Sequence, residues 1–214
     1  MLFRSYSVKA ISTDSNYQGE AVEDFAITPK GLTISGASAT SRAYNGGTNL
    51  VVSGGTLQGV ESGDTANVSL GGSPSGTVVS AGVGTNKVVT VTGYTISGSA
   101  SGNYSLAQPT DVTVDITAKG LTISGIIIAD KDYDGTTSAR ITGTASYSGL
   151  VAGESFSVAG TPTATFNDPS VGTNKPVTVA GYQAPSANYS IAQPTGLKAS
   201  IVSATPIAGP DLLV

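Results

Sequence analysis

Hydrophobic and polar residues alternate along much of the chain, in short runs that Gly, Asn and Pro interrupt. Val112, Val114 and Ile116 have Thr and Asp as neighbours, and Leu32 and Ile34 are spaced in the same way. A period of two places every second side chain on the same face of a β-strand. The pattern therefore predicts an all-β protein of short strands, each with one buried face.

The pattern recurs along the chain. Residues 30–36 and residues 119–125 both read Lys-Gly-Leu-Thr-Ile-Ser-Gly, and they start 119 − 30 = 89 residues apart. Residues 171–182 match residues 83–94 at ten of twelve positions. Self-similarity at a fixed period is typical of tandem arrays, and a period of about 89 residues is the length of a small domain.

We expect two complete repeats, residues 30–118 and residues 119–204. Residues 1–29 are interpreted as the closing strands of a preceding, truncated repeat, and residues 205–214 as a C-terminal tail. Each repeat contains roughly six to eight short strands separated by turn signals, which favours an immunoglobulin-like antiparallel β-sandwich. A β-solenoid would need a period of roughly 20 to 30 residues, and none is present.

The joints between repeats are short. Ala118 alone connects the closing strand of one repeat to the opening strand of the next, so we expect the domains to be arranged end to end as an extended rod. In the N-terminal remnant, we expect Phe25 and Ile27 to lie near the joint and lead into the strand of Leu32. Residues 1–18 are expected to pair with another copy or to lie loosely.

Composition excludes several classes of function. The chain has no Cys and no His, which excludes disulfides and metal sites built from thiolate or imidazole. A net charge of −4 without a basic cluster argues against nucleic acid as a partner. No apolar run approaches the roughly 18 to 20 residues that span a bilayer, so we expect no membrane insertion. Residues 1–10 lack the apolar core of a signal peptide, so any export signal is expected outside this sequence.

Two further readings of the composition are disfavoured. The 28 Gly residues would suit a disordered chain, but 39% hydrophobic residues placed at period two argue for a packed core. An enzyme is not expected, because His and Cys are absent, no nucleophile elbow is present and the acidic residues are scattered.

An ordered set of short motifs resembles a known family. Residues 133–137 read Tyr-Asp-Gly-Thr-Thr; the motifs that follow are Gly149, Gly153-Glu154, Val-Gly-Thr at 171–173, Gly181-Tyr182 and Asn-Tyr-Ser at 188–190. This set resembles the YDG repeat, which is named for its Tyr-Asp-Gly. YDG repeats occur with MBG (mostly bacterial, Ig-like) repeats in large exported bacterial adhesins that resemble filamentous haemagglutinin.

The first repeat departs from the name motif. It has Tyr44, Asn45 and Gly46 where the second repeat has Tyr133, Asp134 and Gly135. Asn supports the same turn as Asp, so the departure weakens a metal-binding role more than a structural one.

The resemblance implies a secreted or cell-surface bacterial protein, located outside the cell. The chain would then be a non-catalytic stalk or adhesive region. Its partners would be neighbouring repeats of a longer chain and, beyond these, a host-surface or biofilm glycan or protein. The alternative is a module that itself binds a glycan or another surface molecule through exposed Tyr and Thr faces.

No cofactor is expected, apart from calcium at one candidate acidic segment. Asp130, Asp132 and Asp134 have the spacing that opens a calcium-binding loop, because carboxylates at alternate positions can converge on one hard cation. An EF-hand needs Glu at the twelfth position, where this chain has Ile141. The competing interpretation is an acidic strand edge followed by a turn.

The tyrosines divide into structural and surface candidates. Tyr104 and Tyr189, each between Asn and Ser, resemble a tyrosine corner, whose hydroxyl bonds to nearby backbone. Tyr94 and Tyr182 follow Gly and are expected to cap the core. The candidates for a surface that stacks on sugar rings are Tyr6, Tyr17 and Tyr147.

Overall fold

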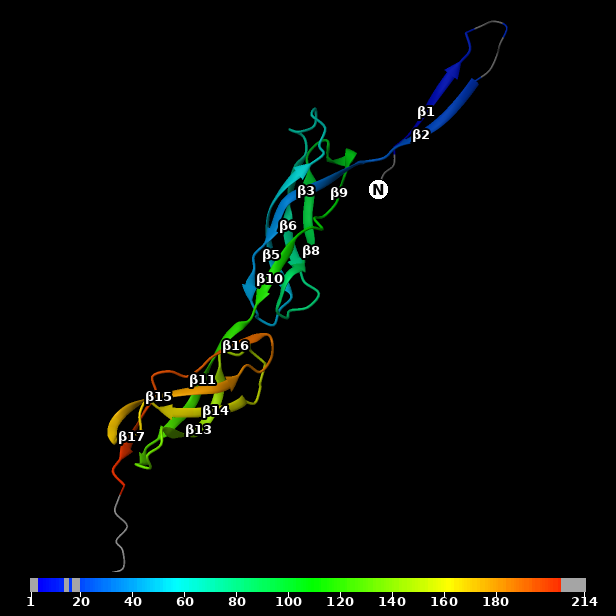
Figure 1. The fold of residues 1–214 in the computed structure, drawn as a ribbon. Coiled ribbons are helices and arrows are strands. Elements are labelled where there is room, and N and C mark those ends of the chain that lie inside the picture. Colours follow the sequence, from blue (N-terminus) through cyan, green and yellow to red (C-terminus); the bar gives the residue numbers. More distant parts are fainter. Residues whose placement is uncertain (1–3, 14–15, 17–19, 205–214) are drawn as a thin grey trace, which may run out of the picture. The chain divides into compact units, whose positions relative to one another are not determined.

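The structure, a computed structural model, describes residues 4–13, 16 and 20–204. Within these residues the regular structure is β, apart from one 3-10 turn, η1 (Ser101–Asn103) (Figure 1). The prediction of an all-β protein is confirmed.

The N-terminal remnant contains β1 (Arg4–Ile11) and β2 (Glu20–Ile27). The first repeat contains β3 (Lys30–Ala39), β4 (Arg42–Ala43), β5 (Asn49–Gln58), β6 (Ser69–Thr77), β7 (Gly84–Val88), β8 (Thr90–Ser97), β9 (Tyr104–Leu106) and β10 (Thr113–Thr117). The second repeat contains β11 (Lys119–Ala129), β12 (Lys131–Asp132), β13 (Ser138–Ser148), β14 (Ala159–Phe166), β15 (Gly172–Gln183), β16 (Tyr189–Ala192) and β17 (Lys198–Val202).

The two repeats share one strand order. The second repeat forms a sheet in the order β12-β17-β15-β14-β13-β11-β16, in which β15 pairs with β17 by its first residues and with β14 by its last. In the first repeat the equivalent strand is interrupted at Val89, which separates β7 from β8. The same ladder is therefore divided into two sheets, β4-β10-β7 and β8-β6-β5-β3-β9.

The prediction of antiparallel strand pairing is wrong at the edges of the sheets. The opening strands β3 and β11 pair in parallel with β9 and β16, and β4 and β12 pair in parallel with β10 and β17. Opening and closing strands must run in the same direction if the chain enters a repeat at one end and leaves it at the other. The ladders between the intervening strands are antiparallel, as predicted.

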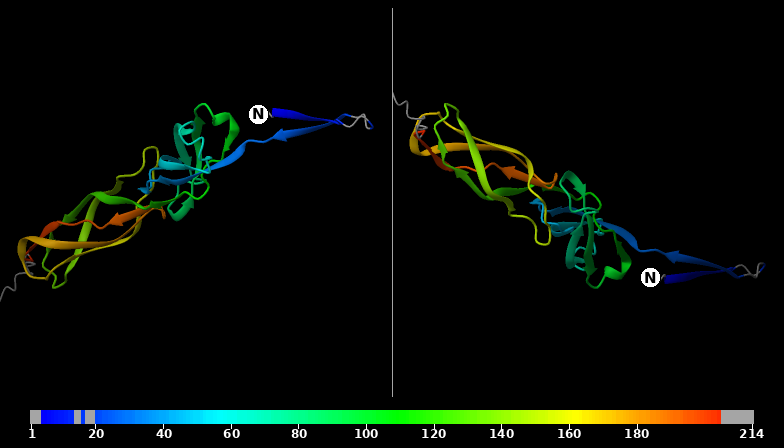
Figure 2. Two further views of the ribbon diagram at one scale, coloured as in Figure 1. Left: turned by 90° about the horizontal axis from the view of Figure 1, so that it is seen from above. Right: turned by 90° about the horizontal axis from the view of Figure 1, so that it is seen from below.

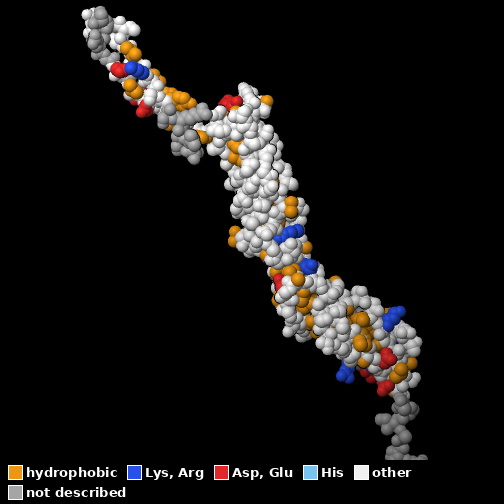
Figure 3. Space-filling model, turned by 180° about the vertical axis from the view of Figure 1, so that it is seen from behind, with side chains coloured by type: hydrophobic (Ala, Val, Ile, Leu, Met, Phe, Trp, Pro, Cys, Tyr) orange, Lys and Arg blue, Asp and Glu red, His pale blue; other side chains and the backbone are white. Residues whose placement is uncertain are grey.

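The buried faces are those that the alternation predicts. Val112, Val114 and Ile116 are all buried, and the matched leucines Leu32 and Leu121 are 0% and 1% exposed. Among the described residues the buried side chains are aliphatic or aromatic, tyrosine included. On the face shown in Figure 3, charged side chains are sparse.

Two compact units make up the chain. The first comprises Met1–Thr40, Thr48–Val79 and Asn86–Val114. The second comprises Ser41–Gly47, Ser80–Thr85 and the chain from Asp115 onward. Three segments of the first repeat therefore belong to the second unit: Ser41–Gly47, Ser80–Thr85 and residues 115–118.

The N-terminal remnant forms a hairpin. β1 pairs antiparallel with β2, from Arg4↔Ile27 to Ile11↔Glu20, and the two strands lie side by side in Figure 2. The expectation that residues 1–18 lie loosely is therefore wrong for the part that the structure describes, whereas their pairing with another copy stays a prediction. Because β2 belongs to the same chain and is close in sequence, it can satisfy the edge of β1. As expected, β2 leads directly into β3; the C-terminal tail lies outside the described residues.

Candidate functional site: the Tyr-Asp-Gly turn and the carboxylate–tyrosine pair

The Tyr-Asp-Gly segment forms a tight turn after β12. Asp134 Oδ1 accepts hydrogen bonds from Thr136 N at 2.9 Å and Thr136 Oγ1 at 2.9 Å. Lys131 Nζ lies 2.7 Å from the same oxygen and also donates to Thr136 O at 2.8 Å. Gly135 has φ +75°, which a residue with a side chain rarely adopts. The motif is therefore an Asx turn that a lysine side chain clamps.

The first repeat builds the same turn from different residues. Asn45 Oδ1 accepts a hydrogen bond from Gly47 N at 3.0 Å, and Gly46 has φ +77°. The Arg42 guanidinium donates one hydrogen bond to Asn45 Oδ1 and another, at 2.5 Å, to Gly47 O. A cationic side chain three residues before the Asx residue is thus common to both repeats.

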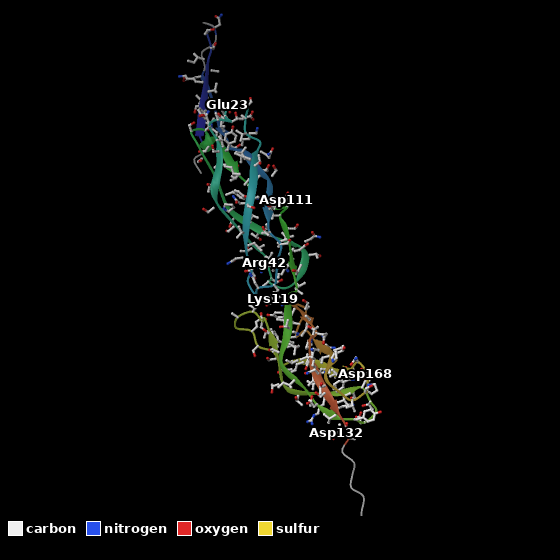
Figure 4. All side chains as sticks on the ribbon, turned by 90° about the vertical axis from the view of Figure 1, so that its left-hand side faces the viewer. Glu23, Arg42, Asp111, Lys119, Asp132 and Asp168 are labelled. Atoms are coloured by element: carbon white, nitrogen blue, oxygen red, sulfur yellow. The ribbon has the colours of Figure 1, made fainter. Side chains whose placement is uncertain are left out.

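The structure does not bring the three candidate calcium ligands together. Asp130 Oδ1 accepts a hydrogen bond from Ser200 N at 2.6 Å, so its side chain is bonded to the middle of the closing strand β17. Asp132 is exposed in β12, at the opposite end of the second unit from Lys119 (Figure 4). The Asp134 carboxylate is bonded to Lys131. The residues described contain no group of three potential acidic metal ligands.

Calcium is expected to leave the stability of the second unit unchanged. A ligand that binds only the native state raises the melting temperature, whereas Lys131 already places a positive charge on Asp134. Thermal unfolding in millimolar calcium and in chelator checks this. An upward shift in calcium that Asp134→Asn abolishes would establish the metal site instead.

Asp134 should make stability depend on acid pH. The hydrogen bond from Lys131, followed by those from Thr136, lowers the pKa of Asp134 from 3.8 to about 2. A carboxyl whose pKa is depressed in the folded state stabilises above its unfolded pKa, and that contribution is lost as the pH falls through the folded pKa. We therefore expect Asp134→Asn to lower the melting temperature at pH 5 and to have little effect near pH 2. Thermal unfolding between pH 2 and 6 measures the difference, with Asp132→Asn as the matched control. Equal deficits at pH 5 and pH 2 would contradict this assignment.

A second cluster lies within the second unit and joins two tyrosines to one carboxylate. Tyr189, 4% exposed at the start of β16, accepts a hydrogen bond from Val151 N at 3.0 Å and donates to Glu154 Oε2 at 2.5 Å. Tyr44 donates to Glu154 Oε1 at 2.5 Å. The two tyrosine rings meet edge to face with centroids 5.5 Å apart, a favourable aromatic geometry. Because they lie in the second repeat, we call Glu154 and Tyr189 the second carboxylate–tyrosine pair.

The electrostatics keep this cluster in one protonation state at neutral pH. Hydrogen bonds from Tyr189 and then Tyr44 lower the pKa of Glu154. The hydrogen bond to Glu154, with burial, raises the pKa of Tyr44. Burial first, and then the hydrogen bond to Glu154, raises the pKa of Tyr189. Two neutral phenols thus donate to one carboxylate, an arrangement suited to holding segments together.

A further hydrogen bond holds Ser80–Thr85, another segment of the first repeat that belongs to this unit. Val83 N donates to Asn188 Oδ1 at 3.0 Å, while the Asn188 backbone oxygen accepts from Lys119 N at 2.9 Å. Ser41–Gly47 and Ser80–Thr85 are therefore both bonded to residues beside Tyr189.

The first unit contains an equivalent of the second pair. Tyr104, 7% exposed, donates to Asp64 Oδ2 at 2.8 Å and accepts from Glu61 N at 3.2 Å. A backbone hydrogen bond closes the loop around the acidic residue in both repeats. Asp64 N donates to Glu61 O at 2.9 Å, and Glu154 N donates to Val151 O at 3.0 Å. Burial first, and then the hydrogen bond to Asp64, raises the pKa of Tyr104. We call Asp64 and Tyr104 the first carboxylate–tyrosine pair.

The hydroxyls of Tyr104 and Tyr189 bond to backbone, as in a tyrosine corner, but not to nearby backbone. Their partners Glu61 and Val151 lie 43 and 38 residues away in sequence. The sequence pattern did not predict that Asp64 and Glu154 are the hydrogen-bond partners of these tyrosines. The available signal was the recurrence of Gly followed by an acidic residue in both repeats.

The other tyrosines behave as follows. Tyr94 and Tyr182 are buried, and Gln108 and Gln193 each bond with a side-chain amide to both backbone groups of their tyrosine. Tyr147 is half-buried, and its hydroxyl donates to Gln183 O at 2.6 Å, so it is not a surface platform. Tyr6 is exposed and stacks on Phe25, and Tyr17 lies outside the described residues.

Comparison with known families fits this architecture of two equivalent repeats. The YDG domain matches residues 28–112 and again residues 117–196, most of the chain. The chain therefore belongs to the YDG domain family. No curated protein and no solved structure matches it. In the described part of the chain, no helix is both long and apolar enough to cross a bilayer.

Proposed function

We propose that the chain is a non-catalytic repeat region of a secreted or cell-surface bacterial adhesin, in which tandem domains present or space a binding region. The observation that carries this proposal is the Tyr44 contact. A turn of the first repeat belongs to the second compact unit, where Glu154 and Tyr189 hold it. This cluster of hydrogen bonds therefore serves the connection between repeats.

The proposal includes immunoglobulin-like sandwiches arranged end to end. Its support is the strand that changes partners, β15 in the second repeat and β7 with β8 in the first. A strand that passes from one ladder to another joins two sheets around one core. The parallel pairing of opening and closing strands also suits domains that pass the chain onward.

Two measurements test the proposed function. Antibodies against the chain should label intact cells of the source bacterium, and surface proteolysis should remove the label. Labelling only after lysis would contradict a surface location. Solution scattering should give an elongated particle, and a compact globule would contradict the end-to-end arrangement.

The alternative is a module that binds a glycan or another surface molecule. It is favoured by Tyr133 and Tyr6, which are 48% and 40% exposed and offer ring faces to a sugar. A screen of host and biofilm polysaccharides separates the two functions. Reproducible binding that Tyr133→Ala or Tyr6→Ala abolishes would favour the binding module over the spacer.

A further inference from the structure

We propose that Tyr133 is a docking residue for a further copy of the repeat, and that the first carboxylate–tyrosine pair is the site that receives such a tyrosine. This proposal rests on the proposed function, because it extends the observed Tyr44 contact to Tyr133 and to the first carboxylate–tyrosine pair. The occupant is a second copy of this repeat, joined in tandem.

Tyr133 and Tyr44 occupy equivalent places. Each follows a two-residue strand paired with a closing strand, and each donates its backbone N–H to that strand at 2.8 Å, Tyr44 to Thr117 O and Tyr133 to Val202 O. Each precedes an Asx turn clamped by a cation. Tyr44, held by a carboxylate–tyrosine pair, is 8% exposed, whereas Tyr133 is 48% exposed.

The first pair has the chemistry to receive a tyrosine hydroxyl. In the second pair, Glu154 accepts Tyr189 on one oxygen and Tyr44 on the other. In the first pair, Tyr104 bonds to Asp64 Oδ2, and the carboxylate has a second oxygen that corresponds to the one receiving Tyr44. The buried Tyr104 ring offers the same edge-to-face partner as Tyr189.

A second hydrogen bond can be matched as well. Val83 N donates to Asn188 Oδ1 within the second unit. Val171 occupies the place of Val83 in an identical Val-Gly-Thr-Asn-Lys segment, and Asn103 precedes Tyr104 as Asn188 precedes Tyr189. A docked repeat would therefore form both bonds, from Tyr133 to Asp64 and from Val171 to Asn103.

The two halves of this contact lie at opposite ends of a repeat. Each carboxylate–tyrosine pair adjoins the start of an opening strand, where Lys30 pairs with Tyr104 and Lys119 with Tyr189. The tyrosine-bearing turn follows the end of that strand. Such a contact is head-to-tail and can continue along an array without closing.

The first pair differs from the second in ways that lower its affinity. Phe156 adds a ring contact to Tyr189 with centroids 6.1 Å apart, and Ala66 stands in its place. Glu61, ion-paired with Lys30, replaces Val151. Separate copies should therefore bind weakly, whereas a covalent joint supplies a high effective concentration.

The experiment compares the chain with an extended one, in which residues 1–203 are followed directly by residues 30–204 carrying Tyr133→Phe, so that Tyr133 occurs only in the first copy. Ser203 then occupies the position of Ala118. Tyrosine nitration, mapped by mass spectrometry, reports the accessibility of each tyrosine. Nitration of Tyr133 should be about sixfold slower in the first copy of the extended chain, by the ratio of the exposures of Tyr133 and Tyr44, 48/8. Tyr6, on the hairpin, is the internal control and should react equally in both chains.

A variant tests the receiving site, and Tyr44 separates the possible failures. Asp64→Ala in the added copy should restore the nitration rate of Tyr133, while Asp24→Ala in the hairpin should not. Equal nitration of Tyr133 in the original and extended chains, with Tyr44 protected in both, would overturn this inference and leave the proposed function intact. If Tyr44 itself reacts as fast as Tyr133, the contact that supports the proposed function fails as well.

Discussion

Gly181→Ala should lower the free energy of unfolding of the second unit by about 2 kcal/mol or more, because both the backbone conformation and the neighbouring backbone exclude a side chain at this position. Gly181 has φ +99°, and a Cβ there would lie 2.5 Å from the Thr161 carbonyl oxygen. Its partner Gly160 is equally crowded, with a Cβ position 2.1 Å from the Gly181 oxygen. The two glycines lie where β14 and β15 shift register, so neither backbone can move without disturbing the ladder.

Urea unfolding of the whole chain measures this effect, and hydrogen exchange of β14 and β15 localises it. Gly120→Ala is the matched control, because Gly120 lies in a strand of the same unit with nothing within 4 Å of its Cβ position. Equal stability of the two variants would show that the paired glycines are not required by the backbone.

Leu121→Ala should destabilise the second unit by about 2 to 5 kcal/mol, the cost of a large cavity in a packed core. Leu121 is 1% exposed, and its strand β11 pairs with both β13 and β16. Native-state hydrogen exchange should show faster opening of these three strands.

Leu32→Ala provides the matched variant, because Leu32 lies in an identical heptapeptide and is 0% exposed. It should accelerate exchange in β3, β5 and β9 and leave β13 unchanged. If either substitution accelerates exchange equally in both units, the two units unfold as one cooperative body.

The local sequence pattern was sufficient to predict the strands and the turns. The alternation around Val114 and the repeated heptapeptide of Leu121 identify buried faces and period, because both follow from side-chain geometry within one segment. Asn45 and Asp134 identify the turns for the same reason, since an Asx turn is closed within three residues.

Long-range pairing was beyond local pattern. An edge strand such as β16 shows the same alternation whether its neighbour is parallel or antiparallel, so the parallel ladders gave no signal. Glu154 lies 35 residues from Tyr189 and 110 from Tyr44, and no local spacing indicates that all three meet. The alternate carboxylates of the calcium candidate failed to converge because Asp130 bonds to Ser200 and Asp134 to Lys131.

The parallel ladder between β11 and β16 has a mechanical consequence. It joins the first strand of the repeat to a strand near its end through four consecutive residue pairs, from Lys119↔Tyr189 to Thr122↔Ala192. A tensile force applied along the chain pulls the two strands in opposite directions along their own axes. The hydrogen bonds between them are then loaded in shear and must rupture together, whereas peeling would break them one at a time. This ladder therefore resists extension of the chain between Lys119 and Ala192, and that extension is limited by the rate at which the ladder opens.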